Sequence, residues 1–148
     1  MKKFFSVLDT GVMSLVTQPL QHTINVEMAR RAGGKIMFYT GERFETLATH
    51  AVLKSKLGER PEIDGFVFFR LKQFNYGPDF NYEFLLDILE HGYETHFSRE
   101  SFSLRSPAEL DAFLPTLLKL ELLGDPGRQG ALRHFLGADY ENLWTIID

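Results

Sequence analysis

The sequence predicts a small α/β protein: a four-stranded parallel sheet with helices on both of its faces. Two observations predict it. Short apolar segments alternate with helical patterns along the first two-thirds of the chain. The strongest apolar segment, Phe66–Phe69, shows no polar alternation, which is typical of a parallel strand covered on both faces. Right-handed crossovers between such strands build a doubly wound sheet, for which we expect the spatial order 2-1-3-4.

The predicted strands are short and mostly apolar, which favours a buried sheet. They comprise Phe4–Leu8, Ile36–Tyr39, Ile63–Phe69 and Tyr93–Ser98. Parallel pairing requires a crossover between consecutive strands, and each interval between them is long enough to hold one helix.

Each of the three intervening helices has its own start or stop signal. The first follows Thr17, a candidate N-cap, and ends at Gly33-Gly34. The second runs from about Phe44 to Leu57. We expect Asp79 to cap the third helix and Gly92 to end it.

The strand–helix alternation ends near residue 104. Ser106-Pro107-Ala108-Glu109 is a capping box with Pro at the first helical position, and it opens a Leu-rich helix that we expect to break near Pro115. The chain has no linker of low complexity. We therefore predict a single domain over 1–148, with an α/β core at 1–104 and a helical extension at 105–148.

The Leu-rich face from Leu110 to Leu122 has two interpretations. It is either ordinary core packing or, where part of it stays exposed, a contact between two copies of the chain. We expect a homodimer.

Composition excludes several classes of function. The chain has 148 residues and a formal net charge of −4, whereas a nucleic-acid binder needs a basic face that displaces counterions. It has no Cys, which excludes disulfides, thiolate metal sites and Cys nucleophiles. The five His residues lack the usual metal-ligand spacings, and neither GxGxxG nor a P-loop is present. We expect no nucleic-acid partner, no metal and no cofactor.

Targeting signals are weak. The apolar start of the chain stops at Asp9, too soon for the apolar region of a signal peptide. No segment approaches the roughly 20 apolar residues that a membrane helix needs. Together with the absence of Cys, this leads us to expect a cytoplasmic protein without a membrane span.

Ligands of open parallel sheets bind at the carboxyl ends of the strands, and polar side chains gather at that predicted edge. The candidate ligand-binding residues are Gln21, His22, Asn25, Arg43, Arg70, Gln73 and Arg99. The candidate catalytic residues are His96, Glu100 and Glu42. Arg guanidinium groups suit phosphate or carboxylate, so the cluster predicts an anion site. We expect His96 to transfer protons, with Glu100 or Glu42 orienting it.

The same cluster has a simpler interpretation. Loops at strand ends are polar in every α/β protein, and their charges pair with one another or with water. On the residues alone, both interpretations stay open.

Several short segments also carry a family likeness, in their order and spacing. They are Pro19–Asn25, Tyr39–Glu42, Ile63–Phe68, Gln73-Phe74 and Glu94–Glu100. In these segments the chain resembles the sporadic carbohydrate cluster proteins, small bacterial proteins encoded among genes for surface-polysaccharide or lipopolysaccharide assembly. The likeness spans about residues 4–104. Two departures fall at the proposed site: Val7-Leu8 replaces an expected Arg-Pro pair, and Arg70 stands where a Ser is expected.

A fainter likeness concerns the catalytic domain of serine recombinases. It rests on Asp64–Leu71 and on Leu86–Gly92, and it implies a resolvase-like fold. The Tyr-x-Arg-x-Ser nucleophile motif of that family is missing from Phe4–Leu8, and the net charge is wrong for DNA. The likeness therefore implies the fold without the activity.

Two functions follow as hypotheses. The first is a small enzyme or ligand-binding accessory protein acting on an anionic sugar intermediate, a sugar phosphate or nucleotide sugar, in surface-polysaccharide biosynthesis. The alternative is a non-catalytic, dimeric scaffold module with a recombinase-like fold. The sequence leaves open which reaction, if any, the chain performs.

Overall fold

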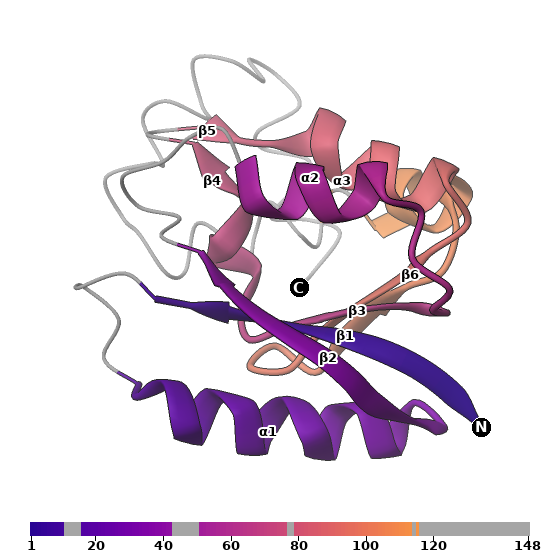
Figure 1. The fold of residues 1–148 in the computed structure, drawn as a ribbon. Coiled ribbons are helices and arrows are strands. Elements are labelled where there is room, and N and C mark those ends of the chain that lie inside the picture. Colours follow the sequence, from indigo (N-terminus) through magenta and orange to yellow (C-terminus); the bar gives the residue numbers. More distant parts are fainter. Residues whose placement is uncertain (11–15, 43–50, 77–78, 114, 116–148) are drawn as a thin grey trace. The chain divides into compact units, whose positions relative to one another are not determined.

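The computed structural model describes residues 1–10, 16–42, 51–76, 79–113 and 115 (Figure 1). The chain divides into two units, Met1–Pro107 and Ala108–Asp148. The first unit is an α/β structure that holds every strand in the described part of the chain. All the candidate residues lie in this first unit.

Five strands form the main sheet, in the order β2-β1-β3-β6-β7. They are β1 (Lys2–Asp9), β2 (Gly34–Glu42), β3 (Gly65–Phe68), β6 (Glu94–Phe97) and β7 (Phe102–Leu104). The first four pair in parallel, and β7 pairs antiparallel with β6. The predicted parallel sheet and its 2-1-3-4 order are confirmed.

The antiparallel strand β7 is an addition that the sequence did not predict. The strand has three residues, too few for a periodic pattern. The chain reverses direction just before it, through Ser101 at a φ of 52°, a conformation that sequence patterns associate with Gly or Asn. The sheet therefore has one more strand than we expected.

Helices cover both faces of the sheet, as predicted (Figure 1). The helix α1 (Gln18–Arg31) lies on one face, and α2 (Ala51–Gly58) and α3 (Tyr82–Glu90) lie on the other. A 3-10 turn and a small hairpin connect β3 to α3; they are η1 (Leu71–Phe74), β4 (Asn75–Tyr76) and β5 (Asp79–Phe80). Within the described ranges, no helix combines the length and apolarity needed to cross a membrane.

The start of α3 corrects one prediction. Asp79 does not cap the helix, because its backbone pairs with Tyr76 in the small hairpin. The cap is Asn81, whose side-chain oxygen accepts a hydrogen bond from the Phe84 N–H at 3.2 Å. The capping group is thus two residues later than we predicted.

Other helix boundaries follow the sequence signals more closely. Gly33 adopts a φ of 86° just after α1, which explains why the helix stops at the predicted glycines. Thr17 precedes α1 but makes no side-chain cap hydrogen bond. Residues 107–113 and 115 are helical, so Pro107 begins a helix as predicted; residue 114 and those after Pro115, where we expected the break, lie outside the described residues. The predicted first turns of α2, at 44–50, lie outside the described residues.

The two faces of the sheet pack differently. Toward α1, a buried cluster joins Phe4, Val67 and Ala29. On the opposite face the core is aromatic: Phe68 stacks on Phe97 with ring centroids 5.5 Å apart, and Phe74 from η1 meets Phe68 edge-on at 4.8 Å. Because both faces are covered, the central strand β3 is apolar along its whole length.

The parallel arrangement decides where a site can form. The carboxyl ends of β1, β2, β3 and β6 share one edge of the sheet, and α1 begins at that edge after β1. The expectation that the four strand tips lie along a common rim is therefore met.

Candidate functional site

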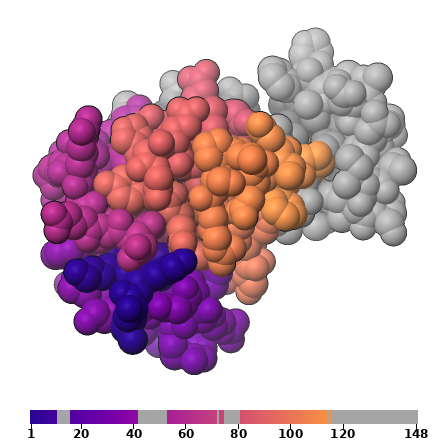
Figure 2. Space-filling view, turned by 90° about the vertical axis from the view of Figure 1, so that its right-hand side faces the viewer, coloured from indigo at the N-terminus to yellow at the C-terminus, as the bar shows by residue number. Residues whose placement is uncertain are grey.

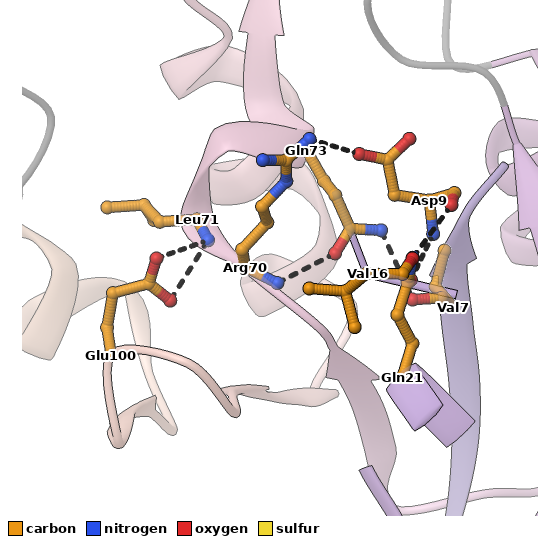
Figure 3. Close-up of polar contacts among 8 residues, drawn as sticks. All are labelled: Val7, Asp9, Val16, Gln21, Arg70, Leu71, Gln73 and Glu100. Carbon is orange, nitrogen blue, oxygen red and sulfur yellow. Dashed lines mark hydrogen bonds and ion pairs between the residues drawn. The ribbon is translucent and has the colours of Figure 1, made fainter. Parts of the chain in front are cut away.

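An ion pair joins the ends of the two central strands, β1 and β3. Asp9, the last residue of β1, is 2% exposed, and its Oδ2 lies 2.6 Å from Nη2 of Arg70 (Figure 3). The Arg70 side chain is 17% exposed. Since a buried carboxylate is strongly destabilising unless it is paired, the ion pair with Arg70 offsets the cost of burying Asp9.

The Gln21 side chain binds the backbone at the end of β1. Its Oε1 accepts a hydrogen bond from the Asp9 N–H at 2.8 Å, and its Nε2 donates to the carbonyls of Asp9 at 3.0 Å and Val16 at 2.9 Å (Figure 3). The side chain is completely buried. These contacts use both the amide oxygen and the amide nitrogen, so Gln21 joins the start of α1 to the tip of β1.

The Gln73 side chain likewise binds backbone groups, at the end of β3. Its Oε1 accepts from the Arg70 N–H at 2.9 Å, and its Nε2 donates to the Val7 carbonyl at 3.1 Å (Figure 3). The side chain, carried by η1, is completely buried. Gln73 thus positions the backbone of Arg70 against β1.

Glu100 lies past the end of β6. Both of its carboxylate oxygens accept from the Leu71 N–H at 3.1 Å (Figure 3). Burial raises the pKa of Glu100 above its usual range, and the Leu71 N–H and the charges of Arg99 and Arg70 oppose this rise only in part. A carboxyl with a raised pKa is suited to proton transfer near neutral pH.

Arg70 keeps unused capacity to donate hydrogen bonds. Its Nε is buried and has no acceptor among the described residues, although Nη2 is bound to Asp9. A buried donor without an acceptor costs about 1–3 kcal/mol. Such an atom in a fixed guanidinium at a strand end is a natural contact for a bound anion or water.

Arg99 and Arg43 are the other two arginines that we predicted at this edge. The side chain of Arg99 is exposed, and its backbone N–H donates to the Phe69 carbonyl at 2.9 Å, which places it beside the end of β3. Arg43 lies outside the described residues, as does the side chain of Glu42. Of the three predicted arginines, the structure therefore places Arg70 and Arg99 at this edge.

Asn25 is buried under the sheet. Its Nδ2 donates to Ser6 Oγ at 3.0 Å and to the Val67 carbonyl at 3.3 Å, and its Oδ1 accepts from Ser98 Oγ at 2.6 Å. The side chain is completely buried. These bonds hold α1 against β1, β3 and the turn after β6, so Asn25 positions the strands.

His22 lies closer to the surface. Its ring packs against Tyr39 of β2 with centroids 5.3 Å apart, and its Nδ1 is buried without a hydrogen-bond partner in the described part of the chain. The structure thus places His22 between α1 and the edge strand β2.

His96 has a different carboxylate partner from the two we expected. Its Nε2 lies 2.9 Å from Glu94 Oε2, and its Nδ1 lies 2.7 Å from Ser103 Oγ. Residues two apart in a strand point to the same face, which brings Glu94 beside His96, whereas Glu100 follows a turn and binds Leu71. The pairing of His96 with Glu100 is therefore not found, and a role in proton transfer stays a prediction.

Sequence reasoning missed three residues of these clusters: Asp9, Glu94 and Ser103. Asp9 had a signal, because it is the first charge after an apolar strand. Glu94 had one too, since the Glu94-x-His96 spacing puts both side chains on one face of a strand. Ser103 had none, because its place depends on the antiparallel return of β7.

Comparisons with known proteins do not identify this site. In the described ranges, no three His, Asp or Glu side chains are grouped to hold a metal ion. The chain matches no family model, no curated protein and no solved structure. Its likeness to the sporadic carbohydrate cluster proteins stays a prediction.

Proposed function

We propose that the carboxyl edge of the sheet binds an anionic sugar intermediate, a sugar phosphate or nucleotide sugar, and that the chain is a small enzyme or accessory protein of surface-polysaccharide biosynthesis. The single observation that supports the anion is Arg70: it is held by Asp9, and its Nε has no acceptor among the described residues. The family likeness supports the sugar.

Preorganisation favours binding at this point. The Asp9 carboxylate fixes one nitrogen of the guanidinium, and Gln73 fixes the backbone of the same residue. Because Arg70 is already ordered, an incoming anion does not bear the side-chain entropy that binding otherwise costs, about 0.5–1.5 kcal/mol per side chain. The exposed Arg99 adds a second positive charge.

Glu100 gives this site a dependence on pH. The group lies close enough to Arg70 and Arg99 for both charges to affect its pKa. Its pKa is raised by burial, so lowering the pH from neutral protonates it and removes the negative charge that Glu100 places near Arg70 and Arg99. Anion binding should therefore strengthen as the pH falls toward the ordinary carboxyl range.

The experiment compares ligand binding by matched variants. Thermal unfolding of the full chain is followed with UDP-glucose, glucose 1-phosphate and inorganic phosphate. A ligand at 100 times its Kd adds about 2.7 kcal/mol to stability. We expect Arg99→Gln and Arg70→Gln each to weaken binding at least tenfold, as does loss of one charged hydrogen bond.

The control is Arg31→Gln, an exposed arginine in the last turn of α1 that pairs with Glu27. It should bind as the unmodified chain does. Because Arg99 is exposed, its variant tests the site even if Arg70→Gln is too unstable to fold. Binding that survives in Arg99→Gln and Arg70→Gln, or no binding by the unmodified chain, would contradict the proposal.

The dimeric scaffold remains a second candidate because of the edge strand β2. This strand is first in the sheet order, so it lies at an edge, and it carries three apolar side chains at the surface: Met37 is 41% exposed, Phe38 54% and Tyr39 69%. Long edge strands with exposed apolar side chains are uncommon in monomers, since they invite pairing with another chain.

Light scattering during gel filtration tests this candidate. We expect a dimer for the unmodified chain and a monomer for Phe38→Lys. Leu20→Lys is the control, because Leu20 is 51% exposed on α1, close to the exposure of Phe38. A monomeric mass for the unmodified chain, or a dimer that tolerates Phe38→Lys, would exclude β2 as the interface.

A further inference from the structure

A second polar cluster runs along the α1 face of the sheet, away from Arg70. Ser103 Oγ lies 2.7 Å from His96 Nδ1, and His96 Nε2 lies 2.9 Å from Glu94 Oε2. The other Glu94 oxygen accepts a hydrogen bond from Nζ of Lys2. We call these four residues the Ser103 relay.

The charges along the relay decide where its protons sit. Burial lowers the pKa of His96, and Glu94 opposes this only in part, so the imidazole is neutral at neutral pH. Burial raises the pKa of Glu94, but hydrogen bonds from Lys2 and His96 outweigh it and leave that pKa below its usual range. The Glu94 carboxylate is therefore ionised.

An ionised carboxylate can only accept hydrogen bonds, so the imidazole proton is on Nε2. His96 Nδ1 then carries a lone pair and accepts the hydrogen bond from the Ser103 hydroxyl. This is the protonation pattern of an activated serine: a hydroxyl, a base that can take its proton, and a third group that orients the base.

We propose that Ser103 is a nucleophile for acyl transfer, with His96 as its general base, Glu94 as the group that orients His96, and carboxylic esters as the substrate class. The proposal does not depend on the anion site, since it uses other side chains. Lys2 acts as a positioning residue that holds the Glu94 carboxylate.

The reaction needs only the ester and water. Ser103 Oγ forms a bond to the ester carbonyl carbon while its proton moves to His96 Nδ1. The bond from that carbon to the leaving oxygen then breaks, and the alcohol departs with the proton from Nδ1. Water attacks the acyl-serine next, and His96 takes a proton from the water and returns it to Ser103 Oγ as the acid leaves. The Glu94 carboxylate stabilises the imidazolium in both halves and stays ionised.

Placement in the fold suits this chemistry. Ser103 and His96 are opposite one another in the β6–β7 pair. His96 is completely buried against the Phe4 ring, whereas Ser103 is partly exposed on the short strand β7. Burial therefore shields the general base from water, and Ser103 is the more exposed residue of the pair.

The relay begins at the amino edge of the sheet. Lys2 and Glu94 are the first residues of β1 and β6, whereas Asp9 is the last residue of β1 and Arg70 follows the end of β3. Figure 2 shows the side of the molecule where the chain starts, with the first residues, in indigo, at the surface. A substrate at the relay would not compete with an anion at the carboxyl edge.

The first test uses a fluorophosphonate probe, which forms a covalent adduct with activated serines. The full chain is labelled, and the adduct is located by peptide mass spectrometry. We expect an adduct on Ser103, none in Ser103→Ala, and a labelling rate at least tenfold lower in Glu94→Gln. The control is Ser101→Gly, which should label normally, because Ser101 is exposed at a φ of 52° that suits Gly.

The second test replaces the hydroxyl by a thiol. The chain has no Cys, so Ser103→Cys and Ser101→Cys each carry a single thiol. Alkylation by iodoacetamide is measured against pH for both. We expect the thiol at 103 to ionise at least one pH unit below the thiol at 101, because His96 can take its proton; an unperturbed thiol has a pKa of about 8.5.

Three charged groups affect the pKa of His96 and could therefore also shift the pH dependence of alkylation. They are Glu94, Arg105 and Lys2. Adding Glu94→Gln to Ser103→Cys should return the thiol toward ordinary behaviour. Two thiols that ionise alike, no adduct on Ser103 in the folded chain, or a labelling rate unchanged by Glu94→Gln would each overturn the proposal.

Discussion

The Arg70 guanidinium lies 2.6 Å from the Asp9 carboxylate, although the two residues are 61 positions apart in the chain. One residue follows β3 and the other ends β1, so the pair exists only when these two strands lie side by side. Its formation therefore reports that the centre of the sheet is assembled.

Asp9→Asn should destabilise the fold by leaving a mostly buried guanidinium without its charge partner. Removing one member of a fully buried pair costs about 3–5 kcal/mol, and since Arg70 is 17% exposed we expect about 2–3 kcal/mol. Urea unfolding measures the change. Glu27→Gln, which breaks an exposed pair on α1, is the control and should barely alter the midpoint. Equal effects of the two variants would contradict the importance of the Asp9 pair.

Gln21→Met should destabilise the chain by about 1–3 kcal/mol, because Met has nearly the same volume but lacks the hydrogen bonds that Gln21 makes to the buried backbone of Asp9. Amide hydrogen exchange at Asp9 gives a local measurement beside the urea midpoint. Gln18→Met is the control, as Gln18 is exposed in the first turn of the same helix. Unchanged protection at Asp9 in Gln21→Met would show that the side chain does not hold this strand end.

Glu100 should make stability fall as the pH rises. Its pKa is raised in the folded state by burial, so the folded state binds the proton more tightly than the unfolded state does. The free energy of unfolding therefore decreases from about pH 4.5, the ordinary carboxyl value, up to the folded-state pKa, and is level above it.

Glu100→Gln removes this titration and can still accept the Leu71 N–H, so its stability should vary less with pH over that window. Urea midpoints at half-unit steps from pH 4 to pH 7 give the two profiles. Glu83→Gln, exposed in the first turn of α3, serves as the matched acidic control. Parallel profiles for the unmodified chain and Glu100→Gln would show that Glu100 does not cause this pH dependence of stability.

Phe97→Ala should cost about 3–5 kcal/mol, since it opens a cavity between the rings of Phe68 and Phe74. Phe38→Ala should cost far less, because that ring is 54% exposed and touches the core through Phe5 alone among the ring contacts we describe. Chemical denaturation measures the free energy of unfolding of both variants. Similar losses would mean that the aromatic face is not the main core.

Much of the fold was predictable because one-dimensional patterns report burial directly. Phe66–Phe69 has no polar alternation, and the structure buries all four of these residues. Gly33 could be recognised as a helix stop because few other residues adopt its φ of 86°. The parallel order then followed from the alternation of strands with helices, since the crossover rule leaves few arrangements.

The candidate site was less predictable, because its residues meet through contacts that have no local signal. Gln21 and Gln73 were recognised as polar residues near strand ends, but their use in binding backbone groups appears only when β1, β3 and α1 are assembled. The partner of His96 is another case: Glu94 shares its face, whereas Ser103 reaches it only through the return of β7.

The sequence by itself determined the class of fold, the order of the parallel strands and the edge where their carboxyl ends meet, because apolar periodicity and helix end signals act over a few residues. The tertiary structure alone decided which polar side chains hold the backbone and which keep donors or acceptors for chemistry. Hydrogen bonds require contact distance, and several of the pairs that share one here, such as Asp9 with Arg70 or Asn25 with Ser98, are far apart in the chain.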